Sequence, residues 1–186
     1  MNPEEPIRGS FAYLEQPWLF SLPPTDQLQL FIDRRLPAPP LTHLSGLVVE
    51  DVADGATTWS IPASPWWRTS AGVFAGGTLA FVADAALAGA VFTTLSSGTM
   101  LASSDLSMNF LEPAWPSSER LVAKGTVIDV GRRQVSLRLE WRTHEGRSSR
   151  TRRPDACFSR FRSSHRSLPR SFRRSRPPRR RHPTRT

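Results

Sequence analysis

Two glycines and one acid stand out in the stretch FAGGTLAFVADAAL, residues 74 to 87. Gly76 and Gly77 come near the start of an apolar run, and Asp84 is the only charged residue in that run. The first N–H groups of a helix have no partner inside it, so glycines there can present N–H groups to a carbonyl or an oxyanion. Burying a carboxylate among apolar residues is costly unless it is hydrogen-bonded or lies at an interface or in a cleft, and a structural pair with Ser, Thr or Arg explains it as well as a site does. We therefore take Gly76, Gly77 and Asp84 as candidate catalytic residues.

The spacing of these residues bears on the number of chains in the site. Asp84 follows Gly76 by eight residues, which is about 12 Å along a helix axis. One reacting carbon cannot lie against both groups of one chain. A two-fold dimer with antiparallel central helices would bring the glycine end of one chain beside the acid of the other. The spacing therefore favours a homodimer.

The apolar run, residues 73–95, is long enough to cross a bilayer. Asp84 near its centre and a composition of Ala, Gly and Thr argue against a membrane span. A helix covered by a sheet fits better, because small residues let strands approach closely. We expect no membrane contact.

The elements around this helix have strand patterns. We predict a helix at about 25–35 and strands near 46–53 and 56–62, which flank Asp54-Gly55 as in a hairpin. After the helix, three further β-type runs lie at 100–111, 120–130 and 134–143, and the last alternates apolar and polar residues. Together these elements predict an α+β fold with an antiparallel sheet wrapped around a central helix.

Charge divides the chain into two parts. Residues 1–146 hold 10 Lys and Arg against 15 Asp and Glu, whereas residues 147–186 hold 15 Arg and one acid. Cys157 is the only cysteine, so neither an internal disulfide nor a Cys/His zinc cluster is expected, and we expect no metal. The first residues lack the basic and apolar regions of a secretory signal. We expect a cytoplasmic protein.

These motifs, in this order, resemble the hotdog-fold acyl-CoA thioesterases of the PaaI type. RTSAGVFAGGTLAFVAD, which ends at Asp84, is similar to the family's Asn-Pro-x-Gly loop, its His-Gly-Gly and the acid nine residues after that His. SSDLSMNFLEPA resembles the family's strand that ends in an aromatic residue, an apolar residue, any residue and Pro-Ala. GTVIDVGRRQVSLRLEW resembles its strands joined by Gly-Arg-Arg. The resemblance covers roughly residues 25–146 and implies a hotdog domain there, after an irregular N-terminal extension over 1–24.

The resemblance also implies an activity and roles for individual residues. Asp84 would be the general base or nucleophile on the thioester of an acyl-CoA, and the Gly76 N–H, with Gly77 beside it, would polarise the carbonyl. Ser103 matches a hydroxyl position that supports the acid in some members, although an ordinary strand serine is an equally good reading. No separate cofactor is implied, because CoA enters as part of the substrate, and the assembly would be a homodimer or a dimer of dimers. The remaining candidate substrate-binding residues are Thr69, Gly72 and Trp67, the last with Trp66 as a roof over the acyl pocket or as a core-packed side chain.

Two positions depart from the family pattern. Ala75 stands where the family has His, and Thr69 stands where it has Asn. An oxyanion site made of backbone N–H groups tolerates Ala75, and Thr69 keeps a hydroxyl that can orient water or the thioester oxygen. The departures favour an alternative, a hotdog protein that binds acyl-CoA without hydrolysing it.

Residues 147–186 differ in composition from the rest of the chain. The segment has Arg without Lys, mixed with Pro, Ser, Thr and His, and almost no β-type alternation. We expect a disordered tail and a missing or altered final strand, and the composition is what a GC-rich reading frame yields when it is shifted. The functional alternative is an arm that binds nucleic acid or an anionic surface, with Phe158, Phe161 and Phe172 between the arginines. Nucleic-acid binding is not expected through any other part of the chain.

Overall fold

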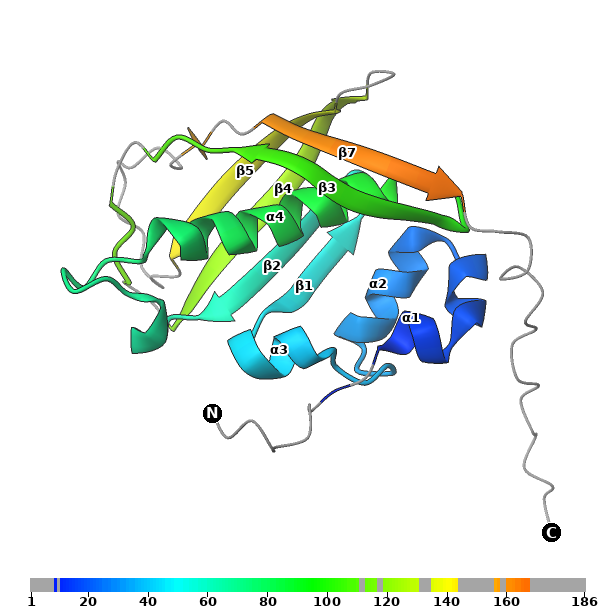
Figure 1. The fold of residues 1–186 in the computed structure, drawn as a ribbon, viewed down its shortest axis with the longest axis horizontal. Coiled ribbons are helices and arrows are strands. Elements are labelled where there is room, and N and C mark those ends of the chain that lie inside the picture. The colour runs from blue at the N-terminus through cyan, green and yellow to red at the C-terminus, as the bar shows by residue number, and fades with distance from the viewer. Residues whose placement is uncertain are drawn as a thin grey trace, which may run out of the picture.

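A single antiparallel sheet curls around one long helix (Figure 1). The computed structural model describes residue 9 and residues 11–110, 113–116, 119–130, 135–143, 156–157 and 160–167. The central helix is α4 (Gly76–Thr93). The strands are β1 (Val48–Ala53), β2 (Ala56–Pro62), β3 (Thr99–Ser107), β4 (Arg120–Val130), β5 (Val135–Thr143), β6 (Ala156–Cys157) and β7 (Arg160–Ser167). The predicted α+β arrangement and the order of its elements up to residue 143 are confirmed.

The strand order is β1-β2-β4-β5-β7-β3, with β6 paired to β5. All of these pairs are antiparallel, and β1 and β2 form a hairpin around Asp54-Gly55, as predicted. The sheet bends so far that β3 and β7 pass on the opposite side of α4 from β1 and β2 (Figure 1). The central helix therefore has strands on two sides.

The strand β7 lies in the segment for which the sequence predicts disorder. It pairs with β3 from Thr99 opposite Ser167 to Ser107 opposite Arg160, and with β5 at Val135 opposite Phe161. The expectation of a disordered tail therefore does not hold for Arg160–Ser167, and the sheet extends beyond residue 146. Apart from these residues and Ala156–Cys157, the segment 147–186 lies outside the described residues.

The helix α4 is apolar on all sides because it is a core element. Its buried residues include Val82, Ala86 and Leu87, none of which is exposed to solvent. By length and composition α4 could cross a membrane, but 56% of it is buried inside the protein, as in the core helix of a folded domain. This finding agrees with the core position predicted from its small residues.

Glycines let the sheet touch the helix backbone. A Cβ added at Gly125 in β4 would lie 2.2 Å from the Ala86 carbonyl oxygen, and one added at Gly89 in α4 would lie 2.7 Å from Thr57 Oγ1. Thr57 Oγ1 donates a hydrogen bond of 2.9 Å to the same Ala86 oxygen and accepts one of 3.1 Å from Trp59 Nε1. The position of α4 on β2 and β4 is therefore set by backbone contact as well as by apolar packing.

The N-terminal extension, which comprises residues 12–45 ahead of β1 and so reaches beyond the predicted 1–24, is folded. It contains the helices α1 (Ala12–Glu15), α2 (Pro24–Ile32) and α3 (Pro40–Ser45), and the 3-10 helix η1 (Pro17–Ser21). The helix predicted at 25–35 corresponds to α2, but the expected irregular extension is wrong for α1 and η1. Ala12, Leu19 and Leu36 form a small buried cluster of their own. Sequence periodicity could not reveal α1 and η1, because each is shorter than two turns.

One arginine connects three neighbouring strands of the sheet. Arg120, the first residue of β4, forms an ion pair of 3.2 Å with Glu50 and donates a hydrogen bond of 2.7 Å to Ser60 Oγ. It also donates to the Gly46 carbonyl oxygen at 3.2 Å, and Ser60 Oγ donates to Glu50 Oε1. The network joins β1, β2, β4 and the end of α3.

Candidate active site

A short loop delivers the chain to the N-terminus of α4. The 3-10 helix η2 (Pro65–Trp67) precedes it, and a bridge between Arg68 and Phe74 closes it. Inside the loop the Thr69 N–H donates to Val73 O at 2.8 Å, and the Gly72 N–H donates to Thr69 O at 2.9 Å. Gly72 has a φ of +85°, which glycine adopts without strain. The loop is a tight turn held by its own backbone.

The start of α4 is open. Ala75 is its N-cap and supplies no side-chain hydrogen bond, while its own N–H donates to Trp67 O at 2.9 Å. The Gly76 and Gly77 N–H groups have no partner inside the helix, because they precede its first turn of hydrogen bonds. An added Cβ at Gly77 would meet nothing within 4 Å. The pair offers two N–H groups and the positive end of the helix dipole to a partner.

An aromatic ring lies over the first of these glycines. The Phe110 ring approaches to 3.2 Å from the position that a Cβ at Gly76 would take, and the ring is 52% exposed. Glycine at position 76 therefore lets Phe110 rest on the helix backbone. Gly77, which is exposed, stays uncovered in this chain.

The central acid forms a short hydrogen bond with a strand serine. Ser103 Oγ on β3 donates to Asp84 Oδ1 at 2.6 Å. Asp84 is half-buried and Ser103 is exposed. The pair reaches the surface of the chain. Ser103 binds Oδ1 of Asp84 and not Oδ2. This bond brings together two of the predicted site residues.

The two halves of the predicted site are separated within the chain. Asp84 follows Gly76 by eight positions of continuous helix, which is about 12 Å at 1.5 Å per residue. The structure thus brings Asp84 to Ser103, but it does not bring Asp84 to Gly76 or Gly77.

The two tryptophans before α4 have different surroundings. Trp67 stacks on Phe81 of α4, with ring centroids 6.3 Å apart and an interplanar angle of 21°, and packs on the main core. Trp66 is 92% exposed. Thr69 is exposed in the loop near them. The predicted roles of Trp67, Thr69 and Gly72 in substrate binding stay predictions.

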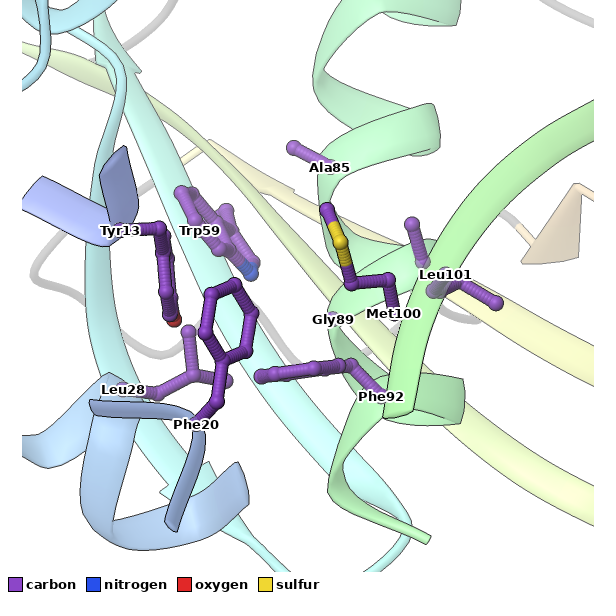
Figure 2. Close-up of a pocket in the computed structure, with 10 residues that line it drawn as sticks. Tyr13, Phe20, Leu28, Trp59, Ala85, Gly89, Phe92, Met100 and Leu101 are labelled. Atoms are coloured by element: carbon purple, nitrogen blue, oxygen red, sulfur yellow. The ribbon is translucent and has the colours of Figure 1, made fainter. Parts of the chain in front are cut away.

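The structure contains an apolar cavity that the sequence did not indicate. It measures about 380 Å³ and lies between the N-terminal extension, α4 and the start of β3 (Figure 2). Figure 2 shows Tyr13, Phe20 and Leu28 on one side, and Phe92, Met100 and Leu101 on the other. The full lining is Tyr13, Phe20, Leu28, Trp59, Ala85, Ala88, Gly89, Phe92, Met100 and Leu101.

Only one pattern in the sequence points to this cavity. Ala85, Ala88, Gly89 and Phe92 repeat at helical spacing, and the first three are too small to fill the space beside α4. The opposite wall comes from residues up to 79 positions earlier, such as Tyr13 relative to Phe92.

Burial in this apolar region raises the pKa of Tyr13 to about 12, because the phenolate would lose its hydration there.

Within the described part of the chain, no group of three or more His, Cys, Asp and Glu residues is gathered as metal ligands would be. Asp84, Ser103 and the backbone at Gly76 and Gly77 are the groups of the candidate site that can act on a carbonyl.

A family model matches part of the chain. Residues 71–149 match the family model of the thioesterase superfamily. That segment contains the loop to α4, the whole of α4 and strands β3, β4 and β5. No curated protein sequence gave a significant match.

Solved structures identify the fold. A thioesterase from Haemophilus influenzae has 22% identity and a TM-score of 0.55, covering 69% of this chain and 83% of its own. A phenylacetic acid degradation-related protein from Ralstonia eutropha has 20% identity and a TM-score of 0.57, covering 74% and 98%. The PaaI protein of E. coli, from its phenylacetic acid degradation operon, has 16% identity and a TM-score of 0.55, covering 78% and 94%.

The fold is therefore the hotdog fold, and the resemblance to hotdog-fold thioesterases of the PaaI type is confirmed. The segment from the α4 loop to the end of β5 carries the sequence pattern of the thioesterase superfamily.

Proposed function

We propose that this protein is a thioester hydrolase that cleaves an acyl-CoA to a free acid and CoA. The family match supports thioester hydrolysis in general. The observation that carries the proposal is the Asp84–Ser103 pair at the surface of a helix whose N-terminus presents Gly76 and Gly77 without a side-chain cap. These are the two requirements of ester-type hydrolysis, a base or nucleophile and a donor site for the oxyanion.

In the proposed reaction the Asp84 carboxylate takes a proton from water, and the resulting hydroxide attacks the thioester carbon. The carbonyl oxygen becomes an oxyanion that accepts hydrogen bonds from the Gly76 and Gly77 N–H groups. Collapse of this intermediate breaks the carbon–sulfur bond, and the CoA thiolate leaves and is protonated by the proton on Asp84. The alternative is direct attack by Asp84 on the thioester carbon, which breaks the carbon–sulfur bond, expels the CoA thiolate and forms a mixed anhydride. Water then hydrolyses the anhydride to the free acid and the Asp84 carboxylate, and the proton released protonates the thiolate. Both routes consume one water and no cofactor.

Each group has one task in this scheme. Ser103 is a positioning residue, because its hydrogen bond to Oδ1 holds the carboxylate and leaves Oδ2 for water. Thr69 and Gly72 lie in the turn that leads to α4, where the Thr69 hydroxyl can reach water or the thioester oxygen. Ala75 cannot supply a backbone donor to the oxyanion, because its N–H already bonds Trp67 O.

The proposal includes a second copy of the chain. Because Gly76 and Asp84 lie about 12 Å apart along α4, the oxyanion donors at one site come from the partner, with the two α4 helices antiparallel. A homodimer contains two such sites, and a dimer of dimers contains four. Cytoplasmic location and the absence of membrane contact stay predictions.

The first test is CoA release from acyl-CoA esters by the wild type and by Asp84→Asn. Loss of the base should lower kcat by about 10²–10⁴-fold. Asp51→Asn is the matched control, because Asp51 is exposed on β1, outside the proposed site. The proposal is wrong if the Asp84→Asn variant keeps wild-type turnover while both variants remain folded and keep the same oligomeric state.

Ser103→Ala separates positioning from folding. Without its hydroxyl, Asp84 Oδ1 loses a charge-assisted hydrogen bond that holds the carboxylate in place. The kcat should therefore fall about tenfold, while KM stays unchanged. Ser103→Thr keeps the hydroxyl and should restore kcat. A kcat that does not fall in Ser103→Ala would assign the serine a structural role only.

A second candidate function is acyl-CoA binding without turnover. It is favoured by Ala75 and Thr69, which stand where the resembling family has His and Asn. Binding of a folded wild-type dimer to acyl-CoA, with hydrolysis no faster than in buffer, would support this function and leave Asp84 as a structural residue.

A further inference from the structure

We propose that the cavity between the N-terminal extension and α4 receives the acyl chain, and that the extension sets the length of chain accepted. This inference rests on the proposed function, since it assigns the cavity to the substrate of the Asp84 site. The occupant is an unbranched acyl chain of medium length. Phe20 and Phe92 are the residues that limit its length.

The first argument is the path from the acid to the cavity. Ala88 lines the cavity and lies four residues after Asp84 on the same side of α4, about 6 Å along the axis. On β3, Leu101 lines the cavity two residues before Ser103, so both point to the same face of the strand. The helix and the strand that hold the Asp84–Ser103 pair therefore both lead into the cavity.

The second argument is the chemistry of the walls. Of the ten lining residues, only Tyr13 and Trp59 carry a polar group in the side chain, the phenol hydroxyl and the indole N–H. The other eight are apolar residues or Gly. The Trp59 indole N–H is already used by Thr57 Oγ1. Such walls gain free energy from a hydrocarbon chain and offer no partner to a charged group.

The third argument is size. A volume of about 380 Å³ is near the lower end of the range of small-molecule pockets, roughly 300–1,000 Å³. From Asp84 to Phe92 the helix advances about 12 Å. The space thus suits a chain of medium length and is too short for a long, extended one.

The extension supplies the far wall. Tyr13 comes from α1, Phe20 from η1 and Leu28 from α2, and Figure 2 shows all three facing α4 across the cavity. The apolar cluster around Leu19 holds this wall together, and Tyr13 packs on Phe20 with ring centroids 5.2 Å apart. Phe20 is therefore a fixed end of the cavity.

Three variants test this assignment. Ala88→Leu fills the cavity at the end that is nearest to Asp84. Phe20→Ala removes the far wall, and Phe20→Leu does so with a smaller loss of packing. Phe11→Ala is the matched control, because Phe11 is 56% exposed in the same extension and does not line the cavity. Circular dichroism establishes that each variant is folded.

The assay measures kcat/KM with acetyl-, octanoyl- and hexadecanoyl-CoA, and the affinity for the non-hydrolysable octyl-CoA thioether. In the wild type each methylene that enters the cavity should raise kcat/KM about fourfold, so octanoyl-CoA should be preferred. Ala88→Leu should lower octanoyl-CoA hydrolysis and thioether affinity by about tenfold or more, and should lower acetyl-CoA hydrolysis by much less. The Phe20 variants should shift the preference towards hexadecanoyl-CoA, and Phe11→Ala should change nothing.

The two readouts separate failure of the inference from failure of the proposed function. A wild type that hydrolyses acyl-CoA, with a chain preference that neither Ala88→Leu nor the Phe20 variants alter, overturns the inference alone. A wild type that hydrolyses no ester overturns the proposed function. In that case, thioether affinity that falls in Ala88→Leu but not in Phe11→Ala still supports the acyl site, and equal affinities, or no binding by the wild type, overturn it.

Discussion

Replacing Gly125 by Ala tests the contact that sets the height of α4 above the sheet. The added Cβ would lie 2.2 Å from Ala86 O, 2.6 Å from Ala86 C and 3.0 Å from Leu87 N. All three are backbone atoms of a helix, so no side-chain rotation relieves the clash. Ordinary contact begins at 3.4 Å, and the strand and helix must therefore separate by about 1 Å.

The expected cost is about 3 kcal/mol, the upper end of the range for overpacked cores, because the displaced atoms are backbone. For a chain of this size that corresponds to a fall in Tm of about 6–12 °C. Differential scanning calorimetry measures it. Gly77→Ala is the matched control for stability, since its Cβ would meet nothing within 4 Å.

The same substitution should reduce activity. Ala86 lies two residues after Asp84, so a shift of α4 against the sheet also disturbs the 2.6 Å bond between Ser103 and Asp84. A Gly125→Ala protein whose Tm and kcat stay within error of the wild type would show that β4 and α4 are not in backbone contact. That result would refute the packing on which the position of Asp84 depends.

Three further predictions concern other parts of the fold. The pKa of Tyr13 is raised to about 12, so neutral Tyr13 stabilises the fold below about pH 10. The free energy of unfolding measured in urea should lose this contribution between about pH 10 and 12. The Tyr13→Phe variant should lack that part of the pH dependence. Arg120→Ala should lower the free energy of unfolding by about 1–2 kcal/mol, because the partly exposed Glu50 loses its ion pair; an unchanged urea midpoint would contradict the network. A chain that ends at Ser167 keeps β7 and should stay folded, yet it should elute from heparin at lower salt because it lacks the eight Arg of residues 168–186; equal elution would remove the basic tail from any role in binding polyanions.

Several features of the fold follow from the sequence alone. The alternation in residues 134–143, the turn at Asp54-Gly55 and the length of the apolar run each depend on neighbours within a few positions. For this reason β2 and β4 begin and end where the pattern predicts, and α4 lies inside the predicted range. The same local reasoning singled out Gly76, Gly77 and Asp84.

Other features depended on contacts between distant residues. The sequence of β7 contains one strongly apolar residue, Phe161, and no pattern marks it as a strand; its place is set by pairing with β3 and β5. The hydrogen bond from Ser103 to Asp84 joins residues 19 positions apart. The sequence around a strand serine does not indicate which residue its hydroxyl binds.

The cavity is the clearest case of a feature that tertiary structure decides. Its walls come from α1, η1, α2, β2, α4 and β3, which together span most of the first hundred residues. Local periodicity determines which face of each element is apolar, because it depends on the helical or strand repeat. Which apolar faces meet, and where small residues such as Ala88 and Gly89 leave space between them, depends on packing of the whole chain.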